Sequence, residues 1–87
     1  MELLLAYLLK QKPLPEGQMK DLLEEALQHI RTQNWEKSLE LFIEATMRNK
    51  NYAEELPRKG ALAILNLLGI QNELNKKYRR KLEMAIF

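Results

Sequence analysis

The stretch that decides the fold is residues 19–52, MKDLLEEALQHIRTQNWEKSLELFIEATMRNKNY. Its apolar residues recur with the period of an α-helix, first over residues 18–32 and again over residues 35–49. A short polar turn separates the two segments, and Asn34 at its end is a suitable N-cap for the second helix. The stretch therefore predicts a helical hairpin.

The segment before this hairpin predicts one more helix and a linker. The helix covers residues 2–12 and ends before Pro13, because a proline disfavours helical geometry in the residue that precedes it. Its apolar residues are too many for an exposed helix, so we expect it to pack on this chain or on a second copy. Valine is absent and no segment alternates as a strand does, which predicts an all-α fold.

Two further helices follow the hairpin, over residues 53–68 and 72–86. Gly69 is a suitable C-cap for the first of them. Pro57 must lie in or near the first turn of that helix, and a helix that began as early as Tyr52 would be kinked by it. The chain of 87 residues is thus expected to form one domain of about five helices, divided into residues 1–17, 18–52 and 53–87.

Composition argues against catalysis and against a membrane protein. The chain has no cysteine and one histidine, His29, which excludes disulfides, thiol chemistry and a multi-histidine metal site. The acid pairs Glu24-Glu25 and Glu54-Glu55 are adjacent, so their side chains diverge on a helix and make no carboxylate dyad. The apolar start is too short to span a bilayer and lacks a signal-peptide pattern. We expect a cytoplasmic protein without cofactor or enzymatic activity.

Large and small residues alternate along the hairpin as two closely crossing helices require. Small side chains at Ala26, Ser38 and Ala45 allow close approach, and large ones fill the gaps between them. The spacing resembles a tetratricopeptide repeat, although the usual small residue in the turn and the terminal proline are missing. Seven residues fall at the usual large and small positions: Leu22, Ala26, His29, Trp35, Ser38, Phe42 and Ala45. We therefore expect Trp35 in the core and His29 as a packing residue.

The last part of the chain, GALAILNLLGIQNELNKKYRRKLEMAIF over residues 60–87, carries a second resemblance. A leucine-rich helix, a Leu-Gly turn and a Tyr-Arg-Arg helix resemble the C-terminal segment of the CnoX (YbbN) family of thioredoxin-like chaperones. The resemblance implies a tetratricopeptide-like domain whose partner is the bacterial chaperonin or a client protein. The thioredoxin-like half is absent, so the chain is either a domain of a longer protein or a free-standing version of the tail.

The final helix concentrates the positive charge, with five cations within residues 76–81. One interpretation is a solvated helix face on which Glu83 pairs weakly with the arginines. Another is docking of a protein partner, because tyrosine and arginine are frequent interface anchors. The residues that we expect to make that contact are Lys76, Tyr78, Arg79, Arg80 and Phe87.

Two alternatives to a protein-docking module stay open at this stage. A small helix-turn-helix DNA-binding protein would place Gln71, Asn72, Asn75 and Lys76 at the front of a recognition helix. The nearly balanced net charge of +2 argues against nucleic acid. The other alternative is a structural oligomerisation domain, with a homodimer formed through the helix at residues 2–12. The favoured prediction is a non-catalytic protein-interaction module.

Overall fold

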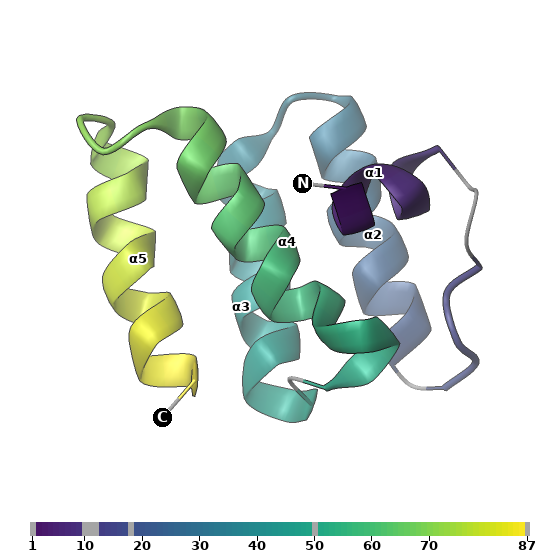
Figure 1. Ribbon diagram of the computed structural model, residues 1–87. Helices are drawn as coiled ribbons and strands as arrows, with labels where there is room; N and C mark the ends of the chain where they lie inside the picture. The colour runs from purple at the N-terminus through teal and green to yellow at the C-terminus, as the bar shows by residue number, and fades with distance from the viewer. Residues whose placement is uncertain (1, 10–12, 18, 50, 87) are drawn as a thin grey trace.

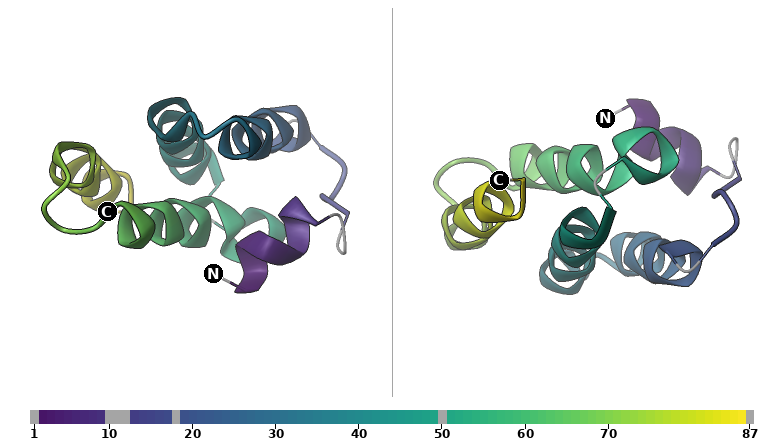
Figure 2. Two further views of the ribbon diagram at one scale, coloured as in Figure 1. Left: turned by 90° about the horizontal axis from the view of Figure 1, so that it is seen from above. Right: turned by 90° about the horizontal axis from the view of Figure 1, so that it is seen from below.

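The computed structural model confirms the all-α prediction. It describes residues 2–9, 13–17, 19–49 and 51–86, and within them the chain contains helices and turns but no strand. The five helices are α1 (Glu2–Leu8), α2 (Met19–Arg31), α3 (Trp35–Asn49), α4 (Tyr52–Leu68) and α5 (Glu73–Ile86) (Figure 1). Helices α2 and α3 lie in one layer, α1 and α4 in the other, and α5 packs at the end against both α3 and α4 (Figure 2).

Small residues bring α2 and α3 together as the sequence predicts. Ala26, Ser38 and Ala45 are all completely buried, and the Ser38 hydroxyl donates a hydrogen bond of 3.0 Å to the Ala26 carbonyl oxygen. Phe42 is also fully buried, whereas Trp35, predicted as a core residue, is half-buried and packs against the edge of the core. Because Trp35 is the first residue of α3, it lies at the end of the hairpin and cannot reach its centre.

The turn between α2 and α3 closes without the small residue that the repeat pattern usually has there. The Gln33 amide donates to the Ile30 carbonyl oxygen at 2.9 Å, and the Asn34 amide donates to the His29 carbonyl oxygen at 2.7 Å. This pair of bonds is a Schellman motif, which requires a left-handed residue, and Gln33 adopts it with a φ of 61°. Asn34 then caps α3, accepting a hydrogen bond of 3.4 Å from the Lys37 amide.

Helix α4 begins at Tyr52, one residue before the predicted start, and is kinked in its first turn. Ala53, Glu54 and Glu55 have positive φ values of 52°, 59° and 67°, so the right-handed part of the helix starts only after them. Pro57 therefore lies in the first right-handed turn, where its missing amide leaves no hydrogen bond unmade.

Helix α1 is shorter than the predicted residues 2–12. It ends at Leu8, four residues earlier, and residues 10–12 lie outside the described part of the chain. Leu4 and Tyr7 are buried against the other helices, so α1 packs on its own chain, one of the two outcomes that we expected.

Candidate interaction surface

Tyr78 fixes α5 to α3. Its side chain is completely buried. Its hydroxyl donates to two carboxylate oxygens, Glu40 Oε1 at 2.9 Å and Glu36 Oε1 at 3.1 Å, which share the one proton. Burial, reinforced by the hydrogen bonds to the two carboxylates, raises the pKa of the Tyr78 hydroxyl. A buried tyrosine cannot touch a docked partner, so the structure corrects the prediction that Tyr78 belongs to the contact surface.

The acidic partners of Tyr78 were not predicted from the sequence. Glu36, Glu40 and Glu44 occur at intervals of four residues, which places them in one row along α3. Lys77 of α5 reaches the same row, with its ammonium 3.9 Å from Glu36 Oε1. The spacing of the three acids was a visible signal, but it does not reveal that their neighbour is α5.

A buried amide fixes the start of α5 to the end of α4. Asn75 is only 2% exposed, and its amide nitrogen donates a hydrogen bond of 2.6 Å to the Leu65 carbonyl oxygen. Its oxygen accepts a bond of 3.2 Å from Nε of Arg79, which is half-buried. Asn72 caps the helix, accepting a bond of 2.8 Å from the Leu74 amide.

These contacts do not favour the helix-turn-helix alternative. That alternative needs Asn72 and Asn75 free to face the bases at the front of a recognition helix. Asn75 is instead buried against α4, and the Asn72 side chain is bonded to the first turn of its own helix.

A cationic row lies on the exposed side of α5. Lys76 and Arg80 are exposed and four residues apart, and Met84, one turn further, is 73% exposed. Lys77 and Lys81 form the adjacent row and lie over the Tyr78 ring, with their ammonium nitrogens 5.2 Å and 5.1 Å from its centroid. We call Lys76, Lys77, Arg80, Lys81 and Met84 the α5 outer face.

The predicted pairing of Glu83 with Arg79 and Arg80 is wrong for the residues that the structure describes. No ion pair joins Glu83 to either arginine there, since Arg79 turns back to Asn75 and Arg80 points outward without an acidic partner. Phe87, the last of the predicted contact residues, lies outside the described part of the chain. Of the predicted set, Lys76 and Arg80 are therefore the two exposed cations.

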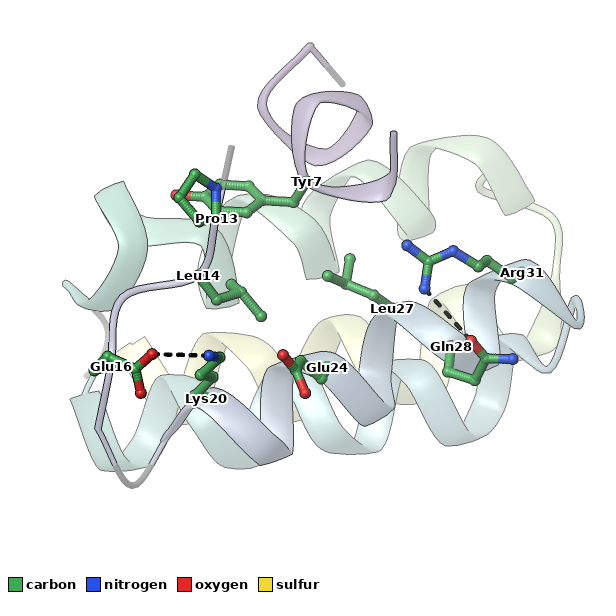
Figure 3. A pocket seen from close by; sticks show the side chains of 9 residues that line it. All are labelled: Tyr7, Pro13, Leu14, Glu16, Lys20, Glu24, Leu27, Gln28 and Arg31. Carbon is green, nitrogen blue, oxygen red and sulfur yellow. Dashed lines mark hydrogen bonds and ion pairs between the residues drawn. The ribbon is translucent and has the colours of Figure 1, made fainter. Parts of the chain in front are cut away.

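A concave region lies between α2 and a wall formed by Tyr7 and residues 13–16 (Figure 3). It has a volume of about 600 Å³, with an apolar floor formed by Tyr7, Leu14 and Leu27. Lys20 and Arg31 stand at its two ends; Lys20 pairs with Glu16 at 2.9 Å, and Arg31 lies 3.4 Å from Gln28. Sequence analysis did not find this cleft, because residues from α1, the linker and α2 meet only in the folded chain.

The described residues hold no constellation that points to catalysis or metal binding. His29 lies 3.9 Å from Glu25 and is half-buried at the edge of α2, consistent with packing. Across residues 2–9, 13–17, 19–49 and 51–86 no cluster of three histidine, cysteine or acidic side chains could hold a metal ion. Within those same ranges, no helix has the length and apolar character needed to cross a membrane.

Comparison with known families agrees with the observed packing of the helical hairpins. A family model described as tetratricopeptide repeat matches residues 16–87, which include α2 to α5. The chain belongs to the tetratricopeptide repeat family. This tetratricopeptide repeat domain matches no curated protein and no solved structure. Repeats of this family stack helical hairpins into surfaces that bind other proteins and are generally not catalytic.

Proposed function

We propose that this tetratricopeptide repeat domain is a non-catalytic module whose protein partner docks on the α5 outer face. The observation that carries the proposal is the row of Lys76 and Arg80, exposed and unpaired within the described chain, beside an exposed methionine. Methionine and arginine are both enriched at protein interfaces. The row thus offers an apolar contact and two cations to an acidic surface.

The way in which α5 is attached to α3 and α4 supports this proposal, because a helix that binds a partner must itself be held firmly. Asn75 attaches α5 to α4 through a buried hydrogen bond, and Tyr78 attaches it to α3 through two partly buried ones. A partner would therefore meet charges on a preformed helix, which lowers the entropy that binding must overcome. Arg79 is half-buried and bonded to Asn75, so its contribution to a contact is secondary to that of Arg80.

For the partner itself, we propose the bacterial chaperonin or one of its client proteins, and a cytoplasmic location. The support is the resemblance of residues 60–87 to the C-terminal segment of the CnoX (YbbN) family. Further proposals are that residues 1–87 form one domain and that Phe87 extends the contact. The homodimer through the first helix stays a prediction, which sedimentation at high concentration tests directly.

Co-purification with chaperonin tests the contact. Lys76→Glu combined with Arg80→Glu should abolish it, because two attractive contacts become repulsive. The matched control is Lys37→Glu combined with Lys59→Glu, which changes the net charge equally at exposed positions on α3 and α4. Equal retention by both double variants would reject the α5 outer face as the docking surface. Absence of chaperonin from the wild-type preparation would reject this partner.

A further inference from the structure

Helices α3 and α5 place a row of acids next to a row of cations. The two helices pack against each other and run in the same direction, each from the top of Figure 1 toward the bottom. The α3 row consists of Glu36, Glu40 and Glu44, and the adjacent row of α5 consists of Lys77 and Lys81. One surface of the domain thus carries a negative stripe beside a positive one.

The two rows lie at the same height along their helices. Lys77 Nζ lies 3.9 Å from Glu36 Oε1, and one turn further along α5 Lys81 lines the same groove as Glu40 and Glu44. The three carboxylate side chains are 45–51% exposed, and both lysines are exposed. A partner that approaches this surface therefore meets both charges at once.

The charges nearest the groove remain available to a partner. Glu44 pairs with Arg48 of its own helix at 3.3 Å, and exposed pairs of this kind contribute little free energy. Within the described chain no carboxylate pairs with Lys81. Its ammonium nitrogen lies 5.1 Å from the centroid of the buried Tyr78 ring, which holds the cation in place. Glu44 and Lys81 can therefore both form new ion pairs.

Two exposed methionines complete this surface. Met47 follows the acidic row on α3 and is 64% exposed, and Met84 follows the basic row on α5 and is 73% exposed. Lys81 lies beside both of them, so the two methionines belong to one continuous surface. Methionine is enriched at protein interfaces. We call the two charged rows together with Met47 and Met84 the α3–α5 face.

A surface with this pattern is complementary to itself. A two-fold axis that runs parallel to the two helices, above the groove, sets α3 of each copy over α5 of the other and preserves height along the helices. Each acidic row then meets a basic row, twice in the same interface, and Met47 of each copy lies at the same end as Met84 of the other. A two-fold axis across the helices would set α3 over α3, and the meeting of like charges disfavours that arrangement.

We propose that the α3–α5 face binds a second copy of this chain, forming a two-fold symmetric dimer in which Glu40 and Glu44 of each copy contact Lys77 and Lys81 of the other. The proposal rests on the proposed function in one respect, that the α5 outer face is a docking surface. Because the dimer covers part of that face, it competes there with any other protein partner and regulates access to it.

The size of the face sets the strength of the dimer. Helices of 15 and 14 residues are about 20 Å long and together about 20 Å wide, which gives a face of about 400 Å² in each copy. Stable interfaces bury about 800 Å² in each partner, so this dimer is weak and reversible. A weak dimer leaves the α5 outer face accessible to a partner that binds more tightly.

Sedimentation velocity of the full chain at low salt, up to about 1 mM, measures the dimer. Glu44→Lys and Lys81→Glu each reverse the charge of one row, and each alone should weaken the dimer at least about tenfold, because like charges then meet at two symmetry-related places. Mixed in equal amounts, the two variants should form a heterodimer with the affinity of the wild type, since every reversed charge then faces an opposite one. The matched controls, Glu24→Lys on α2 and Lys59→Glu on α4, should dimerise like the wild type.

Three results would overturn the proposal: a wild type that stays monomeric up to about 1 mM, single variants that dimerise like the wild type, and a mixture of folded variants that stays monomeric. Should a variant not fold, the wild type decides, because its dimer should weaken at least about tenfold between about 20 mM and 0.5 M salt. A dimer insensitive to salt contradicts charge pairing.

A dimer through the first helix is tested separately. Leu5→Glu combined with Leu9→Glu changes exposed positions on and just after α1 and should leave the α3–α5 dimer intact, so loss of the dimer in that variant would reject the α3–α5 face. Co-purification with chaperonin is an independent readout. A monomeric wild type that retains chaperonin rejects the dimer alone, and a dimer that retains no chaperonin rejects that partner alone.

Discussion

Replacing Gly60 with alanine tests how closely α3 and α4 approach each other. Gly60 lies inside α4, where alanine is normally preferred by about 1 kcal/mol. A Cβ atom at this position would lie 2.8 Å from Cε1 and 2.9 Å from Cζ of Phe42. The Phe42 ring is completely buried, so it cannot move aside without displacing its neighbours.

The magnitudes decide the sign of the effect. Overpacking of this kind typically costs about 1–3 kcal/mol, and two contacts below 3.0 Å place Gly60→Ala in the upper part of that range. After subtraction of the propensity gain, we expect the free energy of unfolding to fall by about 1–2 kcal/mol. For a domain of this size the melting temperature should fall by roughly 5–15 °C, which thermal unfolding followed by far-ultraviolet circular dichroism measures.

The control is the same substitution in a chain that carries Phe42→Leu. Leucine removes the ring edge, so Gly60→Ala should then be neutral or stabilising, and the coupling between the two sites should exceed about 1 kcal/mol. A Gly60→Ala variant as stable as the wild type would refute the reasoning. An equal loss in the Phe42→Leu background would also refute it, because the loss would then have another cause.

Three other substitutions test the backbone and the attachment of α5. Gln33→Gly should raise the free energy of unfolding by about 0.5–1 kcal/mol, because glycine adopts the positive φ of the Schellman turn without steric penalty. Urea unfolding measures this free energy, and a decrease in it would contradict the positive φ at residue 33. Glu54→Gly should destabilise the domain less than Lys59→Gly does, since Glu54 has a φ of 59° whereas Lys59 lies in the right-handed part of α4, where glycine costs about 1 kcal/mol; equal losses would argue against a left-handed turn. Tyr78→Phe should remove part of the alkaline destabilisation. Above pH 10 the unfolded tyrosine loses its proton while folded Tyr78, with its raised pKa, keeps it, so stability falls as the pH rises. An unchanged slope of stability against pH between 10 and 11.5 would show that Tyr78 ionises normally in the folded state.

Local signals in the sequence predicted most of the helices and their ends. The predicted bounds of α3 are the observed ones, and those of α2 and α5 agree to within one residue where the structure describes the chain. Asn34, Asn72 and Gly69 cap their helices as predicted, because capping depends on residues within one turn of each other. The prediction placed the end of α1 just before Pro13, whereas the helix ends at Leu8, because local propensity alone does not decide where so short a helix ends.

The interaction surface was less predictable, because it depends on which face of α5 packs against the core. Tyr78 was assigned to the contact surface, because the sequence does not show which tyrosine contacts the folded chain itself can make. Only the neighbouring carboxylates of α3 show that its hydroxyl has hydrogen-bond partners within the folded chain. The cleft beside α1 had no sequence signal, since its walls come from three segments.

The sequence by itself determined the all-α class, the hairpin of residues 19–52 and the absence of cysteine chemistry, because period, turn residues and composition act over short distances along the chain. Tertiary structure alone decided which cations face outward, that Gly60 accommodates Phe42, and that α1 packs on α4 and α2. Those outcomes depend on contacts between residues far apart in sequence, such as Tyr78 with Glu40 and Arg31 with the Leu8 carbonyl oxygen. Such pairs exist only after the helices have packed.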